Sequence, residues 1–269
     1  MDVTYTAPTI KQNLVYNGSA QDLLNAGTVT GGTMKYSKDE VTWSTSIPQS
    51  TNAALYTSYW RIDGDSNHNN YSGGMLSTRI SKATGSATIS SVTSDYTGSA
   101  QDMISVSGNT GTMHYRVETN GTWQDTKPTR TLVGSDTIYY YMDTSANYFA
   151  QGSESEPWGS VTSTINKATR SGFAVSMANW TYGTTASNPS VSNNYENGTV
   201  TYSYKVNGAA DSTYTSTKPS DVGTYVIRAV ATETDNYKES TATTTFSIIK
   251  LDPSYIAPTA KSLTYSGNA

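Results

Sequence analysis

The stretch Asp221-Val-Gly-Thr-Tyr-Val-Ile-Arg-Ala-Val230 is the most informative part of the chain for predicting its fold. Asp221, Gly223 and Tyr225 form the pattern Asp-x-Gly-x-Tyr, and an alternating run of side chains follows it. Alternation with a period of two is typical of a β-strand that has one face on a core. The stretch therefore predicts a tight corner that leads into a half-buried strand.

The same stretch recurs in altered form earlier in the chain. Asn52-Ala-Ala-Leu-Tyr56 is a weaker copy that keeps the tyrosine. Leu132-Val-Gly-Ser-Asp136 has lost it, and we expect Tyr139 or another residue to take its place.

Other segments repeat with a similar spacing. Tyr16-Asn-Gly-Ser-Ala-Gln-Asp-Leu23 returns as Tyr96-Thr-Gly-Ser-Ala-Gln-Asp-Met103, and a shortened copy ends the chain at Leu263–Ala269. Recurrence at a fixed period indicates an array of structural repeats. A strand of the form Gly-Thr-(Met/Val)-x-Tyr also occurs three times, and in each copy we expect the glycine, the Met or Val, and the tyrosine to face a core. These strands are Gly32–Tyr36, Gly111–Tyr115 and Gly198–Tyr202.

Composition supports an all-β protein and limits its partners. The 269 residues include 21 tyrosines, and β-branched and aromatic side chains favour pleated sheets. Charged residues make up 14% of the chain and the net charge is −4, which predicts neither nucleic-acid binding nor an anionic-membrane footprint. No apolar run is long enough for membrane insertion. With no cysteine, the chain has no disulfides and no thiolate chemistry.

An aromatic residue stands five positions before a proline in each repeat: Trp43, Trp123 and Tyr214. Such rings could stack on a sugar or fill the core. Because their placement is the same in every copy, we expect structural core positions.

The Asp-x-Gly-x-Tyr stretch resembles the tyrosine corner of immunoglobulin-like sandwiches. The runs 14–48 and 175–250 resemble the tandem bacterial immunoglobulin-like repeats of large surface and adhesin proteins. This resemblance implies tandem immunoglobulin-like β-sandwiches of about seven strands each, in an elongated array. It also implies that the Tyr225 hydroxyl, and that of Tyr56, bonds back to the backbone. Ile227 stands where that family often has a cysteine, so aliphatic packing would replace the disulfide.

The repeats predict three domains, 1–83, 84–168 and 169–250, followed by the start of a fourth, incomplete repeat at 251–269. The linkers between the domains are only a few residues long, so we expect adjacent domains of the chain to touch. The opening residues lack the basic and apolar regions of a secretory leader. Because the fourth repeat stops before its own core strands, we expect the natural chain to continue past Ala269.

Residues that could perform chemistry are few. Asp63, Asp65 and Asn67 stand at alternate positions, as at the start of a calcium loop, but Gly74 occupies the place of the bidentate glutamate. We expect a solvated loop there, with no bound metal or cofactor. His114 is predicted to point to solvent. The pattern predicts no enzyme.

The aromatic strands offer a possible ligand platform. Alternation sends Tyr59 to one face of its strand and Trp60 to the other, and Tyr139 and Tyr141 lie in a similar strand. An outward aromatic face suits a sugar or a protein partner, although tyrosine is also an ordinary strand residue.

We therefore expect an extracellular, non-enzymatic stalk or spacer on a bacterial cell surface, with a cell-surface glycan or protein as partner. A phage virion decoration or fibre is the alternative, and a carbohydrate-binding module is the second alternative. The oligomeric state remains open.

Overall fold

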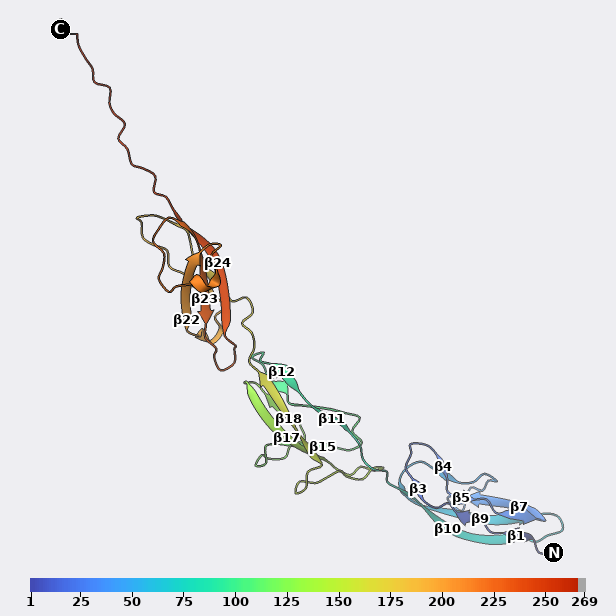
Figure 1. Cartoon of the computed structure of the whole chain (residues 1–269). Helices are drawn as coiled ribbons and strands as arrows, with labels where there is room; N and C mark the ends of the chain where they lie inside the picture. The colour runs from blue at the N-terminus through green and yellow to red at the C-terminus, as the bar shows by residue number, and fades with distance from the viewer. Residues whose placement is uncertain (266–269) are drawn as a thin grey trace. The chain divides into compact units, whose positions relative to one another are not determined.

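A computed structural model describes residues 1–265 of the chain (Figure 1). Its regular elements are β-strands, apart from two short 3-10 turns at Tyr195–Asn197 and Asp211–Thr213. Three four-stranded sheets are present, one within each of the spans 1–83, 84–168 and 169–250. The contacts group the chain into two compact units, residues 1–94 with 98–165, and residues 95–97 with the chain from 166 onward. The structure confirms the predicted all-β array of immunoglobulin-like sandwiches.

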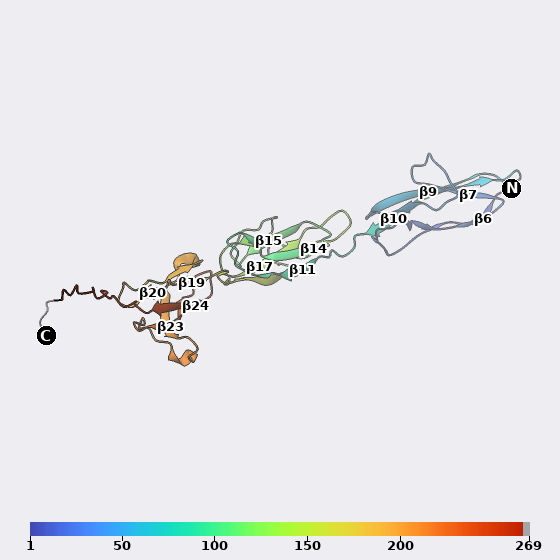
Figure 2. The ribbon, with the colours of Figure 1, turned by 90° about the horizontal axis from the view of Figure 1, so that it is seen from above.

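The first repeat has the most complete sandwich. Its larger sheet has the order β3 (Leu14–Val15), β10 (Tyr71–Ser81), β9 (Ala54–Gly64) and β7 (Gly32–Ser37). β3 runs parallel to β10, and the other pairs are antiparallel. The facing layer consists of three short pairs: β1 (Thr4–Thr6) with β6 (Thr28–Thr30), β2 (Thr9–Ile10) with β5 (Leu24–Asn25), and β4 (Gln21–Asp22) with β8 (Gln49–Ser50). Figure 2 shows β6 on the layer opposite β7 and β9.

The other repeats keep the same larger sheet. In the second its order is β12 (Thr93–Asp95), β18 (Gly159–Asn166), β17 (Gly134–Met142) and β15 (Met113–Val117). Its short pairs are β11 (Thr88–Ser91) with β14 (Ile104–Ser107), and β13 (Gln101–Asp102) with β16 (Thr129–Arg130). In the third the order is β20 (Trp180–Thr181), β24 (Ser240–Ile249), β23 (Gly223–Ala231) and β22 (Val200–Val206). There β19 (Ala174–Ser176) pairs with β21 (Ser190–Ser192).

The number of strands varies around the predicted value of about seven per domain. Within the described chain the first repeat has ten strands, β1–β10, of which β9 and β10 are long, and the third has six, β19–β24. Pro8 explains one interruption, because it separates β1 from β2 and has no N–H to donate to a ladder.

Inward-facing side chains of the strands form the cores. In the first repeat Met34, Tyr36, Trp60 and Ile62 are buried together. Met113 and Tyr115 occupy the same places in the second, and Tyr204, Ile227 and Phe246 are buried in the third. The predicted inward face of the Gly-Thr-(Met/Val)-x-Tyr strands is confirmed. Ile227 is fully buried, so aliphatic packing does stand where the related family often has a cysteine.

The predicted tyrosine corners are present in the first and third repeats. The Tyr225 hydroxyl donates to the Asp221 carbonyl oxygen at 3.0 Å, and the Tyr56 hydroxyl donates to the Asn52 carbonyl oxygen at 2.8 Å. In both cases a ring at the start of a long strand ties that strand to the turn before it. A Cβ added at Gly223 would lie 3.3 Å from the Tyr225 ring, so glycine keeps the corner compact.

An arginine replaces the tyrosine in the second repeat. Arg130 Nε donates to the carbonyl oxygen of Leu132 at 2.8 Å, which is the position equivalent to Asp221. Its Nη2 donates to the Val133 carbonyl oxygen at 3.2 Å, and its Nη1 pairs with Asp136 at 2.6 Å. Of the expected replacements, Tyr139 or another residue, it is therefore another residue that takes the role, since Tyr139 lies under Arg116 on the outer face of its sheet.

The predicted fourth repeat, 251–269, has no partner strands in the described chain. Residues 251–265 are exposed and form no strand, whereas 266–269 lie outside the described residues.

Candidate functional site

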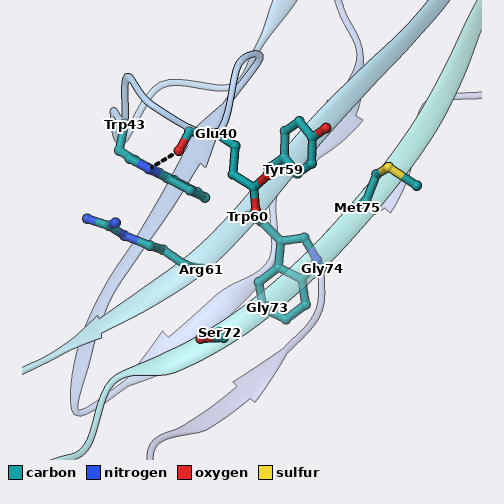
Figure 3. Close-up of a pocket in the computed structure, with 9 residues that line it drawn as sticks. All are labelled: Glu40, Trp43, Tyr59, Trp60, Arg61, Ser72, Gly73, Gly74 and Met75. Atoms are coloured by element: carbon teal, nitrogen blue, oxygen red, sulfur yellow. Dashed lines mark hydrogen bonds between the residues drawn. The ribbon is translucent and has the colours of Figure 1, made fainter.

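The outer face of the larger sheet carries an aromatic groove in the first repeat (Figure 3). Along β9, Ser58, Trp60 and Ile62 point into the core, so Tyr59 and Arg61 point outward. The guanidinium carbon of Arg61 lies 4.5 Å from the centre of the Trp43 ring, in cation–π geometry. The Trp43 indole N–H donates to the Glu40 carbonyl oxygen at 3.2 Å, which fixes the ring over the sheet.

The neighbouring strand β10 forms the other wall of the groove. Met75, which is 62% exposed, pairs with Tyr59 across the strands. A Cβ added at Gly73 would lie 2.3 Å from the Trp60 carbonyl oxygen, so glycine lets β10 pass closely over that residue. The walls enclose about 510 Å³ between the Glu40–Trp43 turn and β10. This shallow space combines flat rings with charged groups.

Tyr59 and Trp60 point to opposite faces of β9, as the alternation predicts. Trp60 is a core residue, 8% exposed, packed with Tyr5 at 5.6 Å and Tyr71 at 5.8 Å between ring centres. It also lines the inner side of the groove. Of the predicted platform in this repeat, only Tyr59 lies on the outer face.

Each other repeat has a related pair of an aromatic ring and an arginine. Arg116 lies 4.7 Å from the Trp123 ring, and Arg228 lies 4.1 Å from the Tyr214 ring. The expectation that Trp43, Trp123 and Tyr214 fill the core is therefore wrong. All three are half-buried, and the guanidinium from the outer face of the adjacent sheet covers the ring.

The second repeat has no open platform, because Tyr141 is covered. His114 stacks on its ring at 4.5 Å, Trp123 meets it edge-on at 4.7 Å, and Tyr141 is 7% exposed. Burial, together with the negative charges of nearby carboxylates, raises the pKa of Tyr141. Tyr139 is half-buried beneath Arg116. Of the possible platform residues in this repeat, Tyr141 is thus buried and Tyr139 lies beneath an arginine.

His114 bridges two loops instead of pointing to solvent. Its Nδ1 lies 2.7 Å from Asp125 and its Nε2 lies 2.8 Å from Asp143, and its side chain is only 15% exposed. The prediction of a solvent-facing side chain is wrong because the sequence gives no sign of the two carboxylates that converge on it.

The carboxylates of the suspected calcium loop have partners within the protein. Asp63 pairs with Arg61, with 2.8 Å between Arg61 Nε and Asp63 Oδ1. Asp65 accepts from His68 Nδ1 at 2.7 Å and from the Asn67 N–H at 2.9 Å. These hydrogen bonds, His68 first, lower the pKa of Asp65. Asp63 thus pairs with another residue of β9, and Asp65 with residues of its own loop.

Within the first unit, the first and second repeats contact each other. The Ala83 N–H donates to the Asn147 carbonyl oxygen at 2.9 Å, and the Phe149 N–H donates back to the Ala83 carbonyl oxygen at 2.8 Å. Between these bonds the Tyr148 ring meets the Tyr16 ring edge-on, with 5.3 Å between centres. We call this set of contacts the joint.

Side chains reinforce the joint. The Asn147 side chain accepts from the Ala53 N–H at 2.8 Å and donates to the Asn52 side chain at 3.3 Å. Lys82 Nζ donates to the Ser145 carbonyl oxygen at 2.6 Å. The loop of the second repeat is thus bonded both to the last strand of the first repeat and to its tyrosine corner.

The second unit contains the same pattern. The Tyr96 ring meets the Tyr237 ring edge-on at 5.5 Å. The Ala168 N–H donates to the Asn236 carbonyl oxygen, and the Lys238 N–H donates back to Ala168, both at 2.9 Å. The dipeptide Asn-Tyr in both loops is a signal that sequence reasoning could have found.

Comparisons with known proteins give only distant likenesses. No protein-family model and no curated protein sequence matches the chain. One similar structure contains three N-terminal domains of the bacteriophage RB49 Highly Immunogenic Outer Capsid protein (12% identity, 93% of this chain and 100% of that one, TM-score 0.24). Another contains the N-terminal four Ig domains of Dscam1 isoform 4.4 (10%, 90% and 73%, TM-score 0.26), and a third is Drosophila N-cadherin EC1-4 (12%, 90% and 75%, TM-score 0.23). With TM-scores below 0.5, these likenesses support no conclusion about function.

Proposed function

We propose that this chain is a non-enzymatic structural array of immunoglobulin-like domains that acts as a stalk or spacer outside the cell. The observation that carries the proposal is the recurrence of the joint, with the same backbone bonds and the same tyrosine pair, in both compact units. A flexible tether between domains needs no such contacts. Repeated, specific contacts between adjacent repeats suit a spacer that holds its ends apart.

The proposed site of action is a bacterial cell surface, with the exterior of a phage particle as the alternative. An antibody raised against the chain should label intact cells or intact particles of the source without permeabilisation. Labelling only after lysis would contradict the proposal.

Orientation of the first two repeats tests the spacer role directly. In the unaltered chain, residual dipolar couplings from residues 1–82 and 84–165 should fit one alignment tensor. Inserting Gly-Ser-Gly-Ser between Lys82 and Ala83 should separate them into two tensors, because the insertion breaks the joint while leaving each sandwich intact. Two tensors in the unaltered chain would contradict a spacer held by the joint.

Carbohydrate binding is a second candidate, favoured by the groove of Trp43, Tyr59, Arg61 and Met75. Flat rings beside charged groups suit the faces and hydroxyls of a sugar. On a glycan array, binding by the chain should be lost in Trp43→Ala. Trp123→Ala is the matched control, because that ring contacts Tyr141 and Arg116 in the second repeat. Equal signals from both variants and the unaltered chain would exclude the groove as the site.

A further inference from the structure

A third copy of one half of the joint lies exposed in the third repeat. Tyr182 stands at the position of Tyr16 and Tyr96 in the repeat alignment. Its N–H donates to the Ile249 carbonyl oxygen at 2.8 Å, and the N–H groups of Tyr16 and Tyr96 make the matching bonds to the last strands of their own repeats at 2.9 Å. The backbone therefore holds all three tyrosines in the same way.

The three copies differ in what covers them. Tyr148 covers the Tyr16 ring and Tyr237 covers the Tyr96 ring, but Tyr182 is 50% exposed, and no aromatic ring among residues 1–265 packs on it. Leu251, at the position of the joint residues Ala83 and Ala168, is 63% exposed.

The lysine just before the joint residue has a partner in the first two repeats but no ion-pair partner among the described residues in the third. Lys82 donates to the Ser145 carbonyl oxygen at 2.6 Å, and Lys167 pairs with Glu233 at 3.3 Å. Lys250, next in this series, is exposed and forms no ion pair with any described residue. A ring, a backbone edge and a cation are thus arranged as in the occupied joints.

We propose that Tyr182, Ile249, Lys250 and Leu251, here called the open joint face, bind the loop between the last two strands of a further repeat of the same type. The inference rests on the proposed array function and names the partner of its open face. The partner loop carries Asn-Tyr, as residues 232–239 do in the third repeat. Its tyrosine packs edge-on against Tyr182, its asparagine carbonyl accepts from the Leu251 N–H, and an oxygen of the loop accepts from Lys250.

A second copy of the described chain does not offer such a loop. Tyr148 and Tyr237 are already used in the joints. The corresponding dipeptide of the first repeat is Asn70-Tyr71, and its ring already packs within that repeat, on Tyr5 at 4.7 Å and on Trp60 at 5.8 Å. The occupant is therefore an additional repeat and not a loop of residues 1–265 from another molecule.

The test uses the full chain with a second copy of residues 169–250 joined directly after Leu251. Hydrogen exchange followed by NMR should show the Leu251 amide slowed about tenfold or more relative to the original chain, because it gains a backbone acceptor. Tyr182→Ala in the extended chain should reverse most of this slowing, whereas Tyr182→Phe, which keeps the ring, should preserve it.

Two internal references, the Ala83 amide and the core amides of the added copy, distinguish failure of this inference from failure of the proposed array function. Fast exchange at Leu251 alongside slow exchange at Ala83 would overturn the open joint face and leave the array function standing. Fast exchange at both amides would overturn both. If the core amides of the added copy exchange freely, residues 84–168 replace it as the added repeat, and unchanged exchange at Leu251 in that chain also overturns the proposal.

Discussion

At the scale of single residues, Arg130 has the same structural role as the two corner tyrosines, Tyr56 and Tyr225. All three side chains donate to a backbone carbonyl oxygen in the turn before a long strand, but the guanidinium reaches it from the preceding strand and brings a charge. A guanidinium has five donors, so it bonds two carbonyl oxygens and the Asp136 carboxylate together.

Arg130→Ala should therefore destabilise the second repeat by about 1.5–3 kcal/mol, the usual range for losing hydrogen bonds to a charged group. Chemical denaturation followed by hydrogen exchange at the Ile138 amide measures this. Arg79→Ala, at an exposed strand position, is the matched control and should change the free energy of unfolding by less than about 0.5 kcal/mol. Equal effects of the two variants would show that Arg130 does not hold the corner.

Tyr225→Phe tests the neutral version of the corner. The variant loses the 3.0 Å bond to Asp221 but keeps the ring stacked on Phe246 at 5.7 Å. We expect a loss of about 0.5–1.5 kcal/mol, confined to the third repeat. Denaturation monitored by exchange at Ile227 checks this, and a loss seen equally at Ile62 of the first repeat would argue against a local corner bond.

Asp39 should make the first repeat sensitive to acid. Hydrogen bonds from the Thr42 and Val41 N–H groups, and from the Ser37 hydroxyl, hold the pKa of Asp39 well below its ordinary value. A carboxylate with a lowered folded pKa stabilises the fold above its unfolded pKa, near 3.9, and this contribution is lost as the pH falls toward the folded value. The slope of stability against pH below about 4 should therefore be smaller in Asp39→Asn, measured by urea denaturation. Asp252→Asn, in the exposed segment after the third repeat, is the control.

At the scale of a strand, two adjacent glycines of β10 have different roles. A Cβ at Gly73 would meet the Trp60 carbonyl oxygen at 2.3 Å, whereas at Gly74 the nearest atom, Trp60 Nε1, would be 3.7 Å away. Gly73→Ala should thus cost about 1–3 kcal/mol in the first repeat through overpacking, and Gly74→Ala should be close to neutral. Thermal unfolding of the two variants decides the point. Similar midpoints would mean that β10 can shift away from β9.

The regular elements were predictable because their causes are local. Alternation places Met34 and Tyr36 inward, and the corner pattern predicts the bond of Tyr225. The faces of Trp43 and His114 were not predictable, because their partners come from other strands and loops of the fold. The spacing between Trp43 and its proline repeats because the outer ring is tied to a turn, and such a repeat does not distinguish an outer position from a core position.

At the scale of the whole molecule, each compact unit contains a joint, in which a loop of one repeat is hydrogen-bonded to the residues that follow the last strand of the preceding repeat. Asn147→Ala should loosen this attachment, because its side chain bonds both Ala53 and Asn52 of the first repeat. We expect exchange at the Ala53 amide to rise about five- to tenfold, equivalent to the loss of about one hydrogen bond, with exchange at Ile138 unchanged. Equal acceleration at both amides would indicate unfolding of the second repeat rather than a loosened joint.

The parallel pairing of β3 with β10, repeated by β20 with β24, determines how a repeat would bear tension. Leu14 lies beside Ile80, and Trp180 lies beside Ile248, in strands near the entry and exit of their repeats. Pulling the entry and exit strands of a parallel pair in opposite directions loads their hydrogen bonds together, in shear. An antiparallel hairpin pulled from its open end would instead lose its bonds one after another. The first and third sandwiches are thus built to resist stretching along the direction in which the chain passes through them.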